Sequence, residues 1–79
     1  MQVTFTPGAL RQWTKLDASV RKRIRAKIDA FAESGSGDVK KLQGRGGSRL
    51  RVGDFRVIFY TEDQIMVIVA VGDRRDIYE

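Results

Sequence analysis

The sequence predicts an α+β fold, in which a helical hairpin packs on one face of a mainly antiparallel sheet. Apolar residues in the first half of the 79-residue chain recur at helical spacings, whereas those in the second half alternate or run together as in strands. Helices packed on one face of the sheet would bury both apolar surfaces. Because the chain is short and has no long linker, we expect a single domain over residues 1–79.

The N-terminal residues predict a short strand followed by a helix. Residues 2–6 alternate polar and apolar side chains, as in a strand. Thr6 and Pro7 are typical of a helix start, because the hydroxyl can cap the helix and proline needs no partner at the first helical position. The helix is expected to end at residue 16. Its apolar stripe would consist of Leu10, Trp13 and Leu16.

A second helix is expected over residues 18–33, with Asp17 as its cap. Apolar residues recur there at spacings of three and four, which is typical of an amphipathic helix. Gly35 can end it, because glycine readily adopts the left-handed conformation of a helix C-cap. The stripe consists of Val20, Ile24, Ile28 and Phe31.

The second half of the chain predicts three to four strands after a glycine-rich loop that runs to residue 48. The run at residues 65–71 is almost wholly apolar, which favours a central strand. Short polar or glycine-containing segments at 53–54 and 62–64 predict tight turns. The expected strands are residues 49–52, 55–61 and 65–71, with a last edge strand at 76–79.

Basic charge is concentrated in one segment, residues 40–56. Six bases and one acid give this segment a net charge of +5, which equals the net charge of the whole chain, because the +3 of residues 1–39 cancels the −3 of residues 57–79. A concentrated basic segment next to strand patterns indicates a polyanionic partner, and nucleic acid is the partner we expect.

Composition also argues against several classes of protein. The chain has no cysteine and no histidine, so disulfides and the usual transition-metal sites are excluded, and we expect neither a metal nor a cofactor. Acid–base chemistry would have to use a carboxylate, Lys, Tyr or the substrate itself. No signal peptide or membrane-spanning segment is expected, which favours a cytoplasmic protein without a membrane partner.

Three segments carry a resemblance to a known family. They are VKKLQG (39–44), LRVGDFRVIFY (50–60) and VIVAVGDRRDIY (67–78), and residues 5–34 are similar to the opening helical hairpin of the same family. Together they resemble toxins of the RelE/ParE superfamily, specifically its RelE branch. The resemblance covers essentially the whole chain.

The resemblance implies a bacterial or archaeal type II toxin that enters the ribosomal A site and cleaves mRNA. In that family the 2′-hydroxyl attacks the adjacent phosphate, and translation is inhibited. The implied partners are the ribosome with its RNA, mRNA, and a co-encoded antitoxin that is expected to be acidic and to cover the exposed sheet face. Toxin and antitoxin would form a heterotetramer that meets operator DNA only through the antitoxin.

The resemblance assigns catalytic roles to four positions. Arg56 and Arg74 match arginines that stabilise phosphate charge, Tyr78 matches a terminal tyrosine that orients a base, and Arg49 matches one of two functional lysines. The bases expected to contact RNA are Lys40, Lys41, Arg45, Arg51 and Arg75.

Two departures from the family pattern keep other functions open. The second functional lysine is replaced by Gly47, and Asp73 stands where related chains often have histidine. Asp73 could be a carboxylate base or could cap the turn and neutralise a neighbouring arginine, and Lys41 is a weaker candidate for proton transfer. The alternatives are a ParE-like inhibitor of DNA gyrase, which is not a nuclease, and an inactive toxin that only binds its antitoxin.

Overall fold

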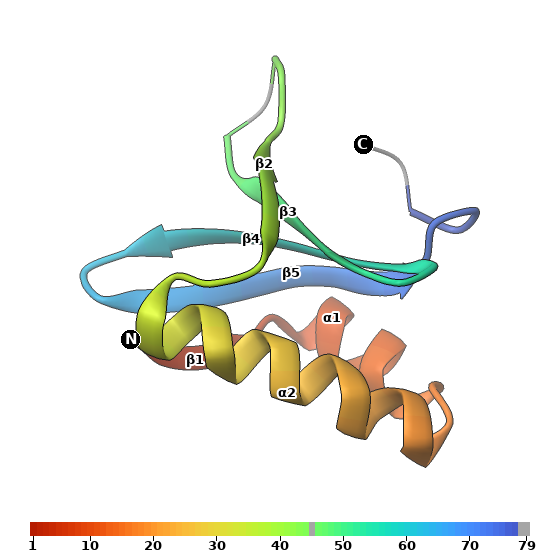
Figure 1. Ribbon diagram of the computed structural model, residues 1–79. Helices are drawn as coiled ribbons and strands as arrows, with labels where there is room; N and C mark the ends of the chain where they lie inside the picture. The colour runs from red at the N-terminus through yellow and green to blue at the C-terminus, as the bar shows by residue number, and fades with distance from the viewer. Residues whose placement is uncertain (45, 78–79) are drawn as a thin grey trace.

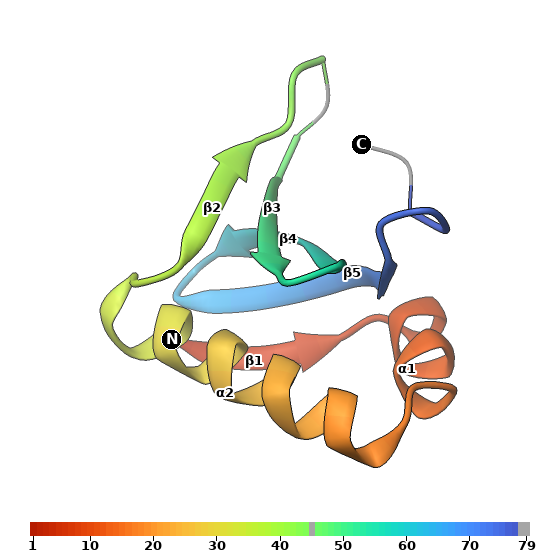
Figure 2. The same ribbon diagram turned by 45° about the vertical axis from the view of Figure 1, so that its right-hand side comes forward.

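The computed structural model describes residues 1–44 and 46–77, which form one sheet and two helices. In chain order the elements are β1 (Gln2–Phe5), α1 (Pro7–Thr14), α2 (Ala18–Ser34), β2 (Asp38–Lys41), β3 (Ser48–Val52), β4 (Phe55–Glu62) and β5 (Ile65–Asp73). The strand order is β1-β5-β4-β3-β2. Among the strands of the described residues, only β1 and β5 pair in parallel, and both helices lie on the same face (Figure 1 and Figure 2). The predicted α+β class is confirmed.

The predicted helix boundaries are largely confirmed by local contacts. The Thr6 hydroxyl accepts a hydrogen bond of 3.2 Å from the backbone N–H of Ala9, so it caps α1. Gly35 ends α2 in the left-handed conformation with φ 75°, and its N–H donates to the carbonyl of Phe31. Asp17 occupies the N-cap position of α2, but its side chain makes no capping bond to a described group. None of the described helices is long and apolar enough to cross a membrane.

The apolar stripe expected on α1 is partly wrong. Leu10 is 50% exposed, whereas Ala9 is fully buried, and Trp13 and Leu16 pack against the core. Positions 9, 13 and 16 follow a helical face as well as 10, 13 and 16 do, and the small Ala9 allows close approach to the sheet. The helix also ends at Thr14, after which Lys15 and Leu16 bond back to carbonyls three residues earlier.

Two strand predictions in the second half need correction. The expected loop before residue 48 contains β2, which has a single apolar residue, Val39, placed opposite Leu50 of β3. The conformation of β2 is therefore determined by its pairing with β3 and not by its own amino-acid composition. In the expected last strand at 76–79, Asp76 and Ile77 are not in a strand, because a turn after β5 directs Ile77 back against Gly72. Residues 78 and 79 lie outside the described part.

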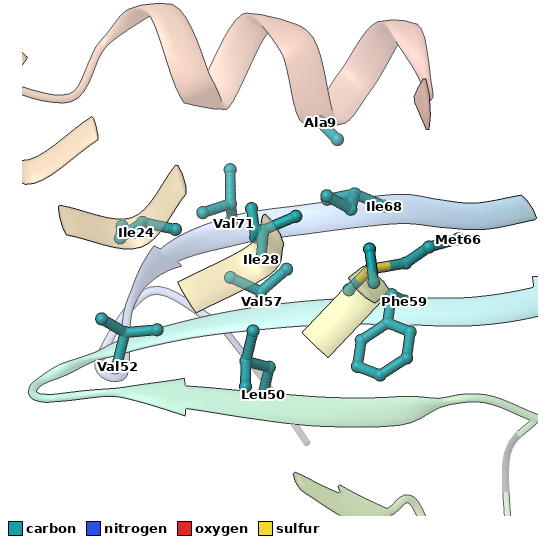
Figure 3. Packing of buried hydrophobic residues seen from close by; sticks show 11 residues of the cluster. Ala9, Ile24, Ile28, Leu50, Val52, Val57, Phe59, Met66, Ile68 and Val71 are labelled. Carbon is teal, nitrogen blue, oxygen red and sulfur yellow. The ribbon is translucent and has the colours of Figure 1, made fainter. Parts of the chain in front are cut away.

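The core lies between the helices and the sheet (Figure 3). The central strand predicted at 65–71 is confirmed as β5, which is flanked by β1 and β4. Phe59 of β4 meets Phe31 of α2 with ring centroids 5.0 Å apart. The most buried large side chains are Ile24, Ile28, Leu50, Val57, Met66, Ile68 and Val71.

Candidate functional site

We call the side of the sheet opposite the helices the open face. The core residues of β3 and β4 point toward the helices, so strand alternation directs their neighbours to the open face. There Lys40 lies opposite Arg49, and Arg51 lies between Asp38 and Arg56 on its two neighbouring strands. These rows of the sheet hold four basic residues and one acidic residue. This excess of positive charge suits the open face to an anionic ligand.

Arg56 is the one charged side chain that the described part of the chain buries, at 7% exposed. Its Nη1 donates to the carbonyl oxygens of Gly53 at 3.0 Å and Phe55 at 3.1 Å. Burying a cation is costly unless it is hydrogen-bonded, and these carbonyls of the β3–β4 turn offset part of that cost. These bonds hold the guanidinium in position before a ligand arrives.

The end of β5 meets the same turn. The backbone N–H of Arg74 donates to the carbonyl of Asp54 at 2.8 Å, and Gly72 lies opposite Arg56 in the sheet. Arg74 is therefore brought to the corner where Arg56 is held. A pocket of about 260 Å³ at this corner is lined by Asp54, Asp73, Arg74 and Arg75.

Asp73 caps the turn that follows β5. Its Oδ1 accepts hydrogen bonds from the backbone N–H of Arg75 at 3.0 Å and from the Arg75 Nε at 3.3 Å. The backbone bond is the main cause that lowers the pKa of Asp73 below its ordinary value, and the charges of Arg75 and Arg74 act in the same direction. The geometry favours the turn-capping role over that of a general base, since a lowered pKa weakens a base.

Lys41 is not brought to Arg56. It lies opposite Ser48, which lies opposite Phe59, so it belongs to a row of the sheet three residues along β4 from Arg56. That is about 10 Å along the strands, plus two strand spacings of about 5 Å each. By alternation Lys41 also points to the other side of β2 from Lys40. A proton transfer by Lys41 at a phosphate bound to Arg56 is therefore not supported by this geometry.

Gly47 has a structural reason to lack a side chain. Its φ is 103°, and a Cβ atom built on it would lie 2.8 Å from the backbone carbonyl oxygen of Phe59. The loop at this position thus packs directly on β4. A lysine, which the family resemblance would place here, does not fit this backbone.

Substitution of Gly47 by lysine should therefore lower stability and not restore a missing cation. A non-glycine residue at such a φ costs about 1–3 kcal/mol, which corresponds to a fall in melting temperature of at least ~4 °C. Gly46→Lys is the matched control, because a Cβ there meets nothing within 4 Å. Thermal unfolding of both variants checks this, and equal melting temperatures would contradict it.

Three other residues were predicted for the site, Arg45, Arg75 and Tyr78. Arg75 is exposed and bonded to Asp73, while Arg45 and Tyr78 lie outside the described residues. Sequence reasoning missed Tyr60, which is 41% exposed on β4. The signal was present, because Arg56, Ile58 and Tyr60 recur at every second position and so share the open face.

Comparison with known protein families finds one matching family model. It is described as the ParE toxin of the type II toxin–antitoxin system parDE, and it matches residues 3–78. A RelE-like toxin protein of Escherichia coli is 31% identical over 84 residues, covering 98% of this chain and 88% of the relative. The mRNA interferase toxin RelE of Escherichia coli K12 is 28% identical over 75 residues, covering 89% and 79%.

Solved structures show the same fold. The toxin in a RelB–RelE antitoxin–toxin complex from Methanococcus jannaschii has a TM-score of 0.77 and 25% identity, covering 94% of this chain and 93% of that chain. The isolated Escherichia coli RelE toxin has a TM-score of 0.73 and 26% identity, covering 91% and 82%. A heterotetrameric YoeB–YefM complex from Staphylococcus aureus, at 20% identity and a TM-score of 0.74, covers 89% and 92% and supports the fold alone.

Proposed function

Because this chain belongs to the RelE/ParE superfamily of type II toxins, and its relatives include RelE-like toxins, we propose that it cleaves mRNA in the ribosomal A site. The toxin would act as an endoribonuclease and so stop translation. One relative is named an mRNA interferase, at 28% identity over most of the chain. The residues of the open face are what make this activity chemically reasonable for this chain.

The observation that carries the proposal is the buried Arg56, which is held at the turn to which the backbone of Arg74 is also bonded. A phosphate under attack by a 2′-hydroxyl gains negative charge, and a fixed guanidinium stabilises that charge without reorganisation. Arg56 is held by two carbonyls of the turn, and Arg74 is tied to the same turn through the carbonyl of Asp54. Arg49 and Arg51 extend the positive surface along β3.

The reaction would form a bond between the 2′ oxygen and phosphorus and break the bond between phosphorus and the 5′ oxygen. A 2′,3′-cyclic phosphate and a new 5′-hydroxyl result. The 2′ proton must leave to an acceptor, and the 5′ oxygen must receive a proton. Arginine is a poor acceptor because its guanidinium stays protonated far above neutral pH. This role is therefore left to Asp73, Lys41, the substrate or the ribosome, and the geometry supports neither Asp73 nor Lys41 strongly.

Replacement of Asp73 by asparagine should reduce cleavage by less than about tenfold, whereas loss of a general base costs about 10²–10⁴-fold. Asparagine can still accept the bond from the Arg75 N–H, so the turn is kept. The lowered pKa of Asp73 means that its bonds to Arg75 are present above the ordinary pKa and weaken only as the pH falls through the lowered value. Single-turnover cleavage against pH checks this, and a hundredfold loss in the variant would make Asp73 the base.

We also propose that a co-encoded antitoxin neutralises this toxin. The structural neighbour from Methanococcus jannaschii was solved with an antitoxin, and the fold of the two toxins agrees over 94% of this chain. The cations of the open face favour an acidic antitoxin segment. A heterotetramer and contact with operator DNA through the antitoxin belong to the same proposal.

Inhibition of DNA gyrase remains the second candidate. The matching family model carries the ParE description, and the backbone at Gly47 excludes one of the two basic groups that the RelE branch uses. A gyrase inhibitor would have this fold and would be neutralised by an antitoxin, but it would not cleave RNA.

Pulse labelling after induction without antitoxin separates the two functions. The mRNA-cleaving toxin should stop incorporation of labelled methionine within minutes, while labelled thymidine incorporation continues at first. Early loss of thymidine incorporation together with a DNA-damage response would support the gyrase inhibitor. No effect on either label would support an inactive toxin.

A further inference from the structure

Tyr60 lies at a notch in the sheet edge that the proposed mechanism does not use. The last pair between β3 and β4 is Ser48 with Phe59, so Tyr60 extends one position beyond the end of β3. Gly47 directly precedes β3 and lies beside Tyr60, since a Cβ built on Gly47 would lie 3.9 Å from the Cβ of Tyr60. Because Gly47 has no side chain, this flank of Tyr60 stays open.

A pocket of about 300 Å³ lies at the notch, and its lining includes Leu42, Gly47, Phe59 and Tyr60. Tyr60 is 41% exposed although it is large and apolar over most of its surface. Lys41, Ser48 and Thr61 also line the pocket, although strand alternation directs their side chains to the other side of the sheet from Tyr60. Exposed aromatic faces hold unpaired nucleobases, since every base has a face that can stack.

The position of the notch relative to the arginines fits a single RNA strand. Arg49 lies opposite Ile58, and Tyr60 follows Ile58 on the same face at about 7 Å along the strand. Arg56 lies two residues before Ile58 on β4, about 7 Å away in the direction opposite to Tyr60. A strand whose phosphates follow Arg56 and Arg49 along the open face would bring the next base to the notch.

We propose that Tyr60 forms a nucleobase-binding subsite for single-stranded RNA. The proposal deepens the proposed function, since it names where a base beside the cleaved phosphate would bind. The chain lacks the cation that the family resemblance would place at position 47, and the glycine found there leaves space beside the ring of Tyr60. Phosphate attraction is thus reduced at one position while base stacking is gained.

The test uses the purified full chain and a fluorescent single-stranded RNA of six nucleotides with 2′-O-methyl groups, which cannot be cleaved. Anisotropy titrations compare the wild type with Tyr60→Phe, which keeps the ring, and Tyr60→Leu, which keeps an apolar side chain opposite Val67 but cannot stack. Tyr60→Phe should bind as the wild type does, and Tyr60→Leu about tenfold more weakly. Equal binding by all three chains, or no binding by the wild type, would overturn the subsite.

A second measurement does not depend on the variants folding. RNA that carries 4-thiouridine is photocrosslinked to the wild type, and the attached peptide is identified by mass spectrometry. Crosslinks should fall on the peptide that contains Tyr60, and crosslinks confined to other peptides would overturn the proposal. Because the probe is not cut, a chain that binds it through Tyr60 but leaves translated mRNA intact would refute the nuclease and keep the subsite.

Discussion

Replacement of Arg56 by alanine should reduce the single-turnover rate of mRNA cleavage on the ribosome by about 10²–10³-fold, the loss expected for one fixed group that stabilises transition-state charge. The guanidinium is buried and held by the carbonyls of Gly53 and Phe55, so its charge is fixed in place before the substrate binds. Cells that express the variant without antitoxin should grow.

Two further variants separate charge from folding. Arg56→Lys keeps a cation but loses the planar fork, so it should recover only part of the rate. Arg25→Ala removes an exposed arginine of α2 that pairs with Asp29 on the helical side, and it should cleave at the wild-type rate. If Arg56→Ala is folded and well expressed and still arrests growth, the assignment of Arg56 is wrong.

Replacement of Phe59 by alanine should lower the free energy of unfolding by about 3–5 kcal/mol. Phe59 is 2% exposed and packs on the ring of Phe31, so its loss leaves a cavity between α2 and the sheet. A domain of 79 residues has a free energy of unfolding of only about 4–12 kcal/mol. The variant is therefore expected to lose a quarter or more of its stability.

Urea unfolding followed by circular dichroism measures this change. Thr61→Ala, on the same strand but exposed, serves as the control and should change the free energy of unfolding by less than about 0.5 kcal/mol. A midpoint for Phe59→Ala equal to that of the control would show that the Phe31–Phe59 contact does not stabilise the fold.

The fold could be predicted from the sequence wherever local signals and burial agree. Thr6, Gly35 and the apolar run of β5 each specify their structure through a local conformation or a large buried surface. β2 could not be predicted, because its one apolar residue gives no periodicity and its register depends on distant Leu50. The same holds for Ala9 and Leu10, whose burial depends on how closely α1 approaches the sheet.

For the candidate site, alternation predicts which side of a strand a residue faces but not how residues meet across strands. The sharing of one face by Arg49 and Arg51 could be predicted, and the structure agrees. The burial of Arg56 and its bonds to the turn could not, because they depend on the path of the backbone around Gly53. Asp73 could be assigned to either of two roles until its bonds to Arg75 were seen.

Primer extension on a reporter mRNA after induction of the wild-type chain tests the central claim most directly. The proposed function predicts cuts at fixed positions within codons, only in the translated region, and their disappearance both in Arg56→Ala and when the start codon of the reporter is removed. Intact mRNA during growth arrest by the wild type, or cuts that persist without translation, would contradict it.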